Sequence, residues 1–349
     1  MINYFFISSP LHFFIATNLA ISHKNDINIA LFISKNEQTA KQYAKATKQF
    51  KDIFQQTHDL TINDDQLKFK QRKLRFNQIQ DLISSVLPDR IFTGSDRRME
   101  FQFAMHQARK LNAKVEGIYI DDGTVSYLGH KSIKSVFHKH IDPILKKLVY
   151  GFWWKNALTT GSSTWISKAY LAVPKDAHPL LKTKKLIALD QSIFLSDEFL
   201  AVNEFLIEKY DALNSINFSK VKAVLCLPNE SFYLKDLDFL HQIKNTIFKH
   251  FQPAEIAIKA HPKSKDMTLL SEFFPDSISL PNTLGMELLL PKLSDETSII
   301  GDVSTALLTA KWLKPKVTVQ AFEVNSDISK NLKNLFNSLG ISFLSLESV

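Results

Sequence analysis

The chain has 349 residues, of which 45% are hydrophobic and 22% are charged, and its formal net charge is +8. This composition excludes an intrinsically disordered protein, and the length is sufficient for two globular domains. The 43 basic and 35 acidic residues are mixed along the chain. This pattern favours an anionic substrate or a membrane surface as partner, and we expect no nucleic-acid partner.

The chain contains a single cysteine, Cys226, so no disulfide can form within it. Cys226 lies in an apolar run, which predicts a buried structural thiol in a reducing cytoplasm. The N-terminal residues lack the features of a signal peptide, and charged residues interrupt every long apolar run. We therefore expect a cytoplasmic protein that is soluble or peripherally attached to a membrane.

Strands and helices are predicted to alternate through the first part of the chain, which indicates an α/β domain. In chain order the predicted elements are strand 3–7, helix 11–22, strand 27–33, helix 76–87, strand 90–93, helix 100–111, strand 115–120, strand 185–189 and helix 195–213. The polar segment 37–76 has helical propensity and suggests no chemistry.

A basic and aromatic region over residues 132–170 is predicted to be helical. Its segment 144–155 combines lysines with Phe152, Trp153 and Trp154, which suits a membrane-interface or glycan-contacting surface. A packed helix whose aromatic side chains fill the core of the first domain explains the pattern equally well. The sequence leaves both interpretations open.

The polar segment 214–219 separates the first domain from a second one, so we expect domains over residues 1–215 and 216–349. The second domain is predicted to contain strand 221–227, helix 234–249, strand 256–259, strand 277–280, helix 286–292, strand 298–300, helix 304–312, strand 316–320, helix 328–339 and strand 342–346. The expected architecture is α/β, with two Rossmann-like domains facing each other across a cleft.

A turn with two carboxylates, Asp121 and Asp122, follows the predicted strand 115–120. Gly123 allows the sharp exit from this strand that other residues would resist. Ligands bind at the carboxyl ends of strands in open α/β sheets, where one of two close carboxylates can act as a general base. A simple turn in which aspartate caps the next segment is the alternative.

His261 follows a predicted strand and precedes Pro262, which keeps residue 261 extended. Lys259 and Lys263 make this loop basic, so a histidine here can donate a hydrogen bond or a proton to a departing phosphate. A lone His-Pro pair in a loop is also compatible with a purely structural role.

Hydroxyl side chains precede two predicted helices. Ser304 and Thr305 begin a helix in the second domain, where free N–H groups and the helix dipole favour a phosphate. Ser9 begins a helix in the first domain, and there we favour a helix cap over an anion site. Glu287, at the start of another helix, is suited to accept hydrogen bonds from a ribose or to lie on the surface.

Taken together, the Asp-Asp-Gly turn at 121–123, the His261-Pro262 pair and the Ser304-Thr305 pair resemble the motifs of bacterial sialyltransferases. The resemblance is to the lipooligosaccharide sialyltransferases of glycosyltransferase family 52 and to the capsular polysialyltransferases. It extends to residues 118–124 and to Met286-Glu287, and it covers most of the chain. It implies a GT-B fold that binds CMP-sialic acid.

The resemblance also implies roles for the site residues. Asp122 is expected to deprotonate the acceptor hydroxyl with Asp121 as a supporting group. The family places an aspartate base after the first strand of the second domain, where this chain has Asn229, so Glu230 is a rival base. The donor-binding set is predicted to be His261, Ser304, Thr305, Glu287, Lys263 and Asn282, and Ser9 and Gly123 are assigned to an acceptor or phosphate loop.

The implied reaction is an inverting transfer of sialic acid from CMP-sialic acid to a bacterial surface glycan, with no cofactor and no metal. The alternatives are transfer of another nonulosonic acid or nucleotide sugar, a metal-dependent transferase, and a non-catalytic glycan- or nucleotide-binding protein. Location at the inner face of the bacterial inner membrane, peripheral membrane contact through residues 144–155 and a homodimer are further expectations.

Overall fold

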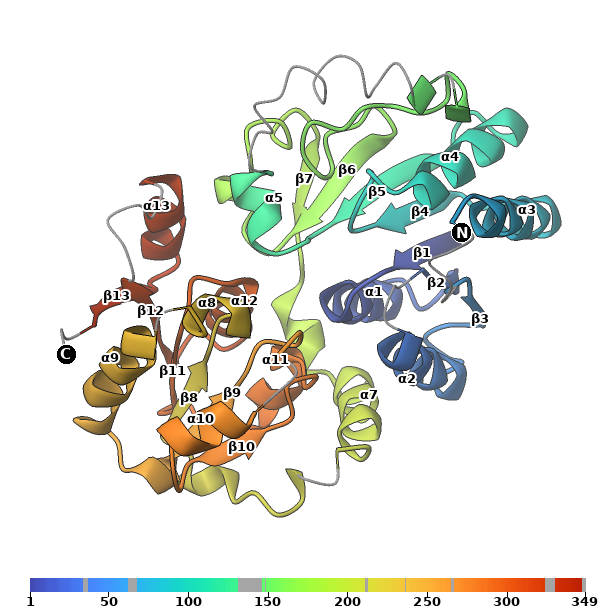
Figure 1. The fold of residues 1–349 in the computed structure, drawn as a ribbon. Coiled ribbons are helices and arrows are strands. Elements are labelled where there is room, and N and C mark those ends of the chain that lie inside the picture. The colour runs from blue at the N-terminus through green and yellow to red at the C-terminus, as the bar shows by residue number, and fades with distance from the viewer. Residues whose placement is uncertain are drawn as a thin grey trace. The chain divides into compact units, whose positions relative to one another are not determined.

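The structure, a computed structural model, describes residues 1–33, 37–61, 68–130, 146–147, 149–210, 213–235, 237–264, 267–323 and 330–346. It contains two compact units, Met1–Val202 and Asn203–Val349, and each is built on one parallel sheet (Figure 1). The division falls within helix α7 (Asp197–Ile207), before the domain boundary that we predicted at residue 215. Both positions lie in the connection between the two sheets.

Unit 1 contains a seven-stranded sheet in the order β3-β2-β1-β4-β5-β6-β7, and neighbouring strands run parallel. The strands are β1 (Ile2–Ile7), β2 (Ile27–Phe32), β3 (Gln56–Asp59), β4 (Arg90–Thr93), β5 (Glu116–Ile120), β6 (Ile166–Leu171) and β7 (Lys185–Ala188). The helices are α1 (Pro10–Ser22), α2 (Glu37–Gln49), α3 (Lys68–Ser85), α4 (Met99–Leu111), α5 (Thr124–Leu128), the 3-10 helices η2 (Pro174–Asp176) and η3 (Gln191–Leu195), and α7.

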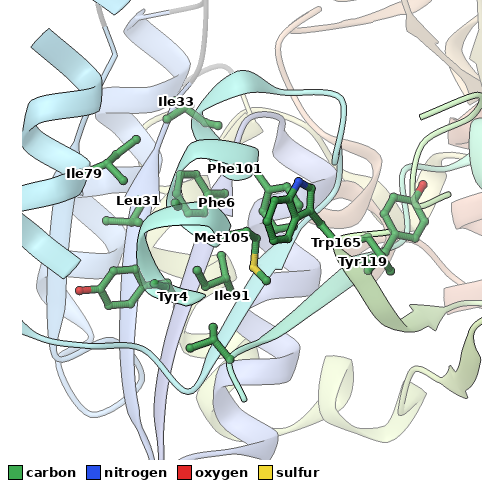
Figure 2. Close-up of a cluster of buried hydrophobic side chains, with 14 of the residues drawn as sticks. Tyr4, Phe6, Leu31, Ile33, Ile79, Ile91, Phe101, Met105, Tyr119 and Trp165 are labelled. Carbon is green, nitrogen blue, oxygen red and sulfur yellow. The ribbon is translucent and has the colours of Figure 1, made fainter. Parts of the chain in front are cut away.

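The central strands of unit 1 are apolar on both faces because helices cover both faces of the sheet. On one face Tyr4 and Phe6 pack with residues of α3 and α4, including Phe101 and Met105 (Figure 2). The next residue along β1, Phe5, points to the opposite face and stacks on Phe92, with ring centroids 4.5 Å apart. This packing holds the strand ends of the sheet in fixed positions.

Two strands of unit 1 contradict the sequence-based expectation. β3 lies in the polar segment that was predicted to be helical. It is a partly exposed strand at the edge of the sheet, so its residues do not alternate between apolar and polar. β6 lies in the region 132–170 that was predicted to be helical, and its pairing with β5 and β7 overrides that propensity. Most of the other predicted elements are confirmed, with shifts at their ends.

The aromatic segment 144–155 is only partly described, because residues 144, 145 and 148 lie outside the described part. Residues 151–155 form a turn and a loop, so the predicted helix is wrong there. Trp153 packs between Phe76 and Phe103, and Trp154 is buried, whereas Phe152 is 83% exposed. Membrane contact through this segment stays a prediction. In the described part of the chain no helix is both long enough and apolar enough to span a membrane.

Unit 2 contains a six-stranded sheet in the order β10-β9-β8-β11-β12-β13, and neighbouring strands again run parallel. The strands are β8 (Ala223–Cys226), β9 (Ile256–Lys259), β10 (Ile278–Leu280), β11 (Ser298–Gly301), β12 (Thr318–Glu323) and β13 (Ser342–Ser345). The helices are α8 (Glu230–Tyr233), α9 (Leu237–Phe248), α10 (Thr268–Phe273), α11 (Met286–Leu289), α12 (Thr305–Leu313), α13 (Lys330–Ser338) and the 3-10 helices η5 (Phe218–Lys220), η6 (Pro253–Glu255) and η7 (Leu290–Lys292). This strand order is that of a Rossmann fold.

The core of unit 2 forms where α9 and α10 cover one face of the sheet. Leu225 and Ile258 from the strands pack with Leu240 and Ile243 of α9 and with Phe274 after α10. Cys226 is buried as predicted, and burial raises the pKa of its thiol to about 11. At the end of β11, Gly301 lies against the backbone of Cys226, and a Cβ atom at this position would lie 2.3 Å from the Cys226 carbonyl oxygen.

We expect Gly301→Ala to destabilise unit 2 by about 1–3 kcal/mol, because the added methyl group forces two neighbouring strands apart. Urea unfolding monitored by circular dichroism measures the effect. Thr318→Ala, at an exposed position of the same sheet, is the control and is expected to change stability by about 0.5 kcal/mol or less. Equal stability of the Gly301→Ala variant and the wild type would contradict the close packing of these strands.

Candidate active site

The candidate residues of unit 1 lie at the carboxyl edge of its sheet. β1 pairs with β2 on one side and with β4 on the other. From β1 the chain therefore first adds strands on one side of the sheet and then, from β4 onward, on the other side. Such a switch point is where open α/β sheets bind ligands. The loops after β1, β4 and β5 meet there and bring together His12, Gly94 and Asp122.

Asp121 is a buried anchor of the turn after β5, with 2% of its surface exposed. Its Oδ1 atom accepts a hydrogen bond from the Gly123 amide at 2.8 Å, and its Oδ2 atom accepts one from the Ala172 amide at 2.9 Å and another from the Tyr127 hydroxyl. Burial raises the pKa of Asp121, and these hydrogen bonds oppose that shift. Asp121 therefore holds the turn in place and offers no free oxygen to a substrate.

Asp122 is the accessible carboxylate of the pair, with 28% of its side chain exposed. Its Oδ1 atom lies 2.9 Å from Nε2 of His12, and its amide donates to Oγ of Ser126 at 2.8 Å. Its Oδ2 atom makes no hydrogen bond to the described residues. One oxygen of Asp122 is thus held by the protein, and the other is available to a ligand.

Two glycines allow this arrangement. Gly123 has a φ of 68°, a left-handed conformation that glycine adopts without strain. A Cβ atom at Gly94 would lie 2.0 Å from Nε2 of His12, so the histidine ring occupies the space that a side chain would fill. The sequence anticipated the role of Gly123 and did not indicate that of Gly94.

The candidate residues of unit 2 lie at the carboxyl edge of the second sheet. Here β8 pairs with β9 and β11, which places another switch point between β8 and β11. Asn229 follows β8, His261 follows β9 and Ser304 follows β11. Asn229 accepts a hydrogen bond from the Ser231 amide at 3.0 Å, and its Nδ2 atom lies 3.4 Å from Nδ1 of His261.

The hydrogen bonds of His261 define which ring nitrogen carries the proton. Nδ1 of His261 accepts a hydrogen bond from the Lys263 amide at 3.1 Å, so in the neutral ring the hydrogen lies on Nε2. Burial lowers the pKa of His261, and the positive charges of Lys263 and Lys259 lower it further. A neutral imidazole that presents an Nε2–H donor is suited to bind a phosphate oxygen.

Lys259 and Glu287 form a buried pair of opposite charges near this loop. Lys259 is 7% exposed and Glu287 is 8% exposed, which excludes the interpretation of Glu287 as a surface residue. Burial lowers the pKa of Lys259 and raises that of Glu287, and the attraction between them opposes both shifts. The ammonium group of Lys259 makes no hydrogen bond to the described residues, so it retains hydrogen-bonding capacity.

Ser304 and Ser9 occupy equivalent positions at helix N-termini but use their hydroxyl groups differently. Both have φ of −149°. The Ser9 hydroxyl accepts a hydrogen bond from the His12 amide at 3.2 Å, which confirms the predicted cap. The Ser304 hydroxyl makes no cap hydrogen bond in the described part of the chain. The Ser304 hydroxyl is therefore not used to cap α12.

The remaining predicted residues lie near the same edge of unit 2. Thr305 begins α12, and Glu230 begins α8 directly after Asn229. Asn282 donates to the Ser264 carbonyl oxygen at 2.7 Å and so supports the loop that carries His261. The side chain of Lys263 is exposed. No group of three or more His, Cys, Asp or Glu side chains with the geometry of a metal site occurs among the described residues.

A basic cavity of about 380 Å³ lies in unit 1. Its cationic and aromatic lining consists of Arg72, Arg97, Lys146, Lys155, Tyr150 and Trp154, and no acidic side chain is among the described residues that line it. Buried Gln102 shapes this cavity, because it donates to the Asp96 carbonyl oxygen at 2.8 Å and accepts from the Lys155 amide at 2.7 Å. The cavity is suited to an anionic group.

Sequence reasoning missed His12, although it proposed a site at Asp122. The only signal was the spacing of Ser8 and His12, four residues apart at the start of a predicted helix, where side chains meet. The contact between His12 and Asp122 spans 110 positions of the sequence, and no local pattern reveals it.

The whole chain is similar in fold to several solved structures. An α/β-galactoside α-2,3-sialyltransferase from Photobacterium phosphoreum matches with a TM-score of 0.59 and 13% identity, over 98% of this chain and 97% of that chain. A sialyltransferase from Photobacterium damsela matches with a TM-score of 0.56 and 12% identity, over 98% and 81%. A UDP-N-acetylglucosamine 2-epimerase matches with a TM-score of 0.59 and 11% identity, over 99% and 84%. At these identities the likeness shows the fold, which is GT-B.

The sequence itself identifies the family. No curated protein matches the chain significantly. The family model described as alpha-2,8-polysialyltransferase matches residues 3–322, which is nearly the whole chain. This match confirms the resemblance that the motifs at 121–123, 261–262 and 304–305 indicated. The chain therefore belongs to the alpha-2,8-polysialyltransferase family and is a glycosyltransferase of the sialyltransferase class.

Proposed function

We propose that the protein transfers sialic acid from CMP-sialic acid to a hydroxyl group of an anionic bacterial surface glycan, with inversion and without a metal ion. The observation that carries this proposal is the geometry of Asp122, whose Oδ1 atom is held by His12 while its side chain stays 28% exposed. This is the arrangement that a general base needs.

In the proposed step, Asp122 removes the proton from the acceptor hydroxyl as the acceptor oxygen bonds to the anomeric carbon. The bond from that carbon to the phosphate breaks, and its electron pair leaves with CMP. A single displacement of this kind inverts the anomeric configuration. The environment of the neighbouring residue supports Asp122 as the base, because Asp121 is 2% exposed and its oxygens accept three hydrogen bonds.

Unit 2 contains the groups suited to a departing phosphate. His261 presents an Nε2–H donor, Lys259 adds a buried positive charge, and the N-terminus of α12, after Ser304, adds the positive end of a helix dipole. Donors and charges of this kind neutralise a leaving phosphate in the way that a metal ion does in other transferases. We assign donor binding to unit 2 on this basis, with Glu287 and Thr305 as further contacts.

The basic cavity of unit 1 supports an anionic acceptor. Its four cationic side chains favour a carboxylate-bearing or phosphate-bearing glycan over a neutral one. An acceptor that ends in sialic acid meets this requirement, because each sialic acid residue carries a carboxylate. A neutral galactoside does not.

Asp122→Asn is expected to lower kcat by about 10²–10⁴-fold, because it removes the proton acceptor and preserves the shape of the side chain. Initial rates with CMP-sialic acid and a sialylated acceptor measure the effect. Glu230→Gln tests the rival base and is expected to retain most of the activity. If Glu230→Gln abolishes transfer while Asp122→Asn does not, the base assignment is wrong.

His261→Ala is expected to lower kcat by about 10²–10³-fold, since it removes one donor to the developing phosphate charge. The control is His250→Ala, at an exposed position beyond the end of α9, which is expected to leave kcat unchanged.

The same assay is repeated in EDTA. Loss of wild-type activity in EDTA would show that a metal ion, rather than these side chains, neutralises the leaving group.

Arg97→Ala is expected to raise the KM for a sialylated acceptor about tenfold, because one charge-assisted hydrogen bond is lost. The KM for a neutral galactoside acceptor and that for the donor are expected to stay the same. Lys114→Ala, at an exposed position outside the cavity, is the matched control for the loss of a positive charge. An equal change for both acceptors would contradict an anion site in this cavity.

A further inference from the structure

His12 is buried and forms hydrogen bonds through both of its ring nitrogens. Its side chain is 3% exposed, its Nδ1 atom lies 2.9 Å from the Ser8 hydroxyl, and its Nε2 atom lies 2.9 Å from Oδ1 of Asp122. We infer that His12 is a positioning residue that aims the Asp122 carboxylate at the acceptor hydroxyl. This inference rests on the proposed role of Asp122 as the base.

The position of the His12 ring is determined by the surrounding backbone. Ser9 accepts the His12 amide hydrogen and thereby begins α1. The ring then lies against Gly94 at the end of β4, where a Cβ atom would be 2.0 Å from Nε2. Ser8, half-buried after β1, holds the other side of the ring. These contacts leave the ring little freedom to rotate.

The hydrogen-bond pattern determines the direction of donation. The ionised carboxylate of Asp122 can only accept, so Nε2 of His12 donates to it. In the neutral ring Nδ1 is then an acceptor, and the Ser8 hydroxyl donates to it. The order Ser8, His12, Asp122 is therefore a chain of donors that ends on the carboxylate.

Asp122 is held at a second point, because its amide donates to Oγ of Ser126, which also lies 2.8 Å from the Tyr119 hydroxyl. The hydrogen bonds at the Asp122 amide and at Oδ1 together restrict the orientation of the carboxylate. Oδ2 is left as the oxygen that receives the proton. His12 thus acts through Asp122 and contacts neither the acceptor nor the donor.

The test compares His12→Ala and His12→Gln in the full-length protein, with kcat and KM measured for CMP-sialic acid and a sialylated acceptor. His12→Ala is expected to lower kcat about 100-fold, the effect of a misplaced catalytic group, with little change in either KM. His12→Gln keeps an N–H donor near the position of Nε2 and is expected to recover most of the loss. His58→Ala, a histidine of β3 outside the site, is the control.

A double-mutant cycle separates positioning from a purely structural role. If His12 acts only through Asp122, then His12→Ala in an Asp122→Asn background lowers kcat no further. A further loss of similar size in that background, or a KM effect equal to the kcat effect, would overturn the inference. If His12→Ala is fully active while Asp122→Asn is inactive, the inference alone fails. If both variants are active, the proposed base fails as well.

Discussion

The buried carboxylate of Asp121 is the interaction on which the site of unit 1 depends. Placing a carboxylate at 2% exposure costs free energy unless hydrogen bonds compensate for the lost water. Three donors from the turn after β5, from α5 and from the end of β6 provide that compensation. Because these donors come from three segments, Asp121 ties them together. The adjacent Asp122 is thereby left at the surface in one defined orientation.

The two units place polar groups by the same rule and differ in the charge of these groups. In each sheet the strand order reverses at a switch point, where loops from neighbouring strands meet. The edge of unit 1 carries the accessible carboxylate of Asp122, whereas the edge of unit 2 carries Lys259 and His261. A carboxylate accepts a proton, and cations with N–H donors stabilise a phosphate. Because of this difference we assign the proposed base to unit 1 and the binding of the CMP-sugar donor to unit 2.

In each unit a hydrogen-bond partner sets the tautomer of a histidine. The Asp122 carboxylate accepts from Nε2 of His12, and the Lys263 amide donates to Nδ1 of His261. In the neutral rings the hydrogen therefore lies on Nε2, which points to Asp122 in the first case. An Nε2–H group thus holds the proposed base in unit 1, and in unit 2 it is available to donate a hydrogen bond to a phosphate.

The sequence by itself determined the α/β class, most strands and the positions of the motifs, because buried parallel strands are apolar runs followed by short polar loops. It also indicated the family, through the resemblance of the motifs at 121–123, 261–262 and 304–305 to those of bacterial sialyltransferases. The sequence analysis missed the edge strand β3 and the strand β6. Both strands are held by pairing with strands that are distant in the sequence, β2 and β5. Only the tertiary structure decided which groups meet. In the tertiary structure Asp121 is buried, and His12 lies against Gly94 and forms a hydrogen bond with Asp122. The sequence could not indicate these contacts, because contacts between loops of different strands leave no periodic signal in the chain.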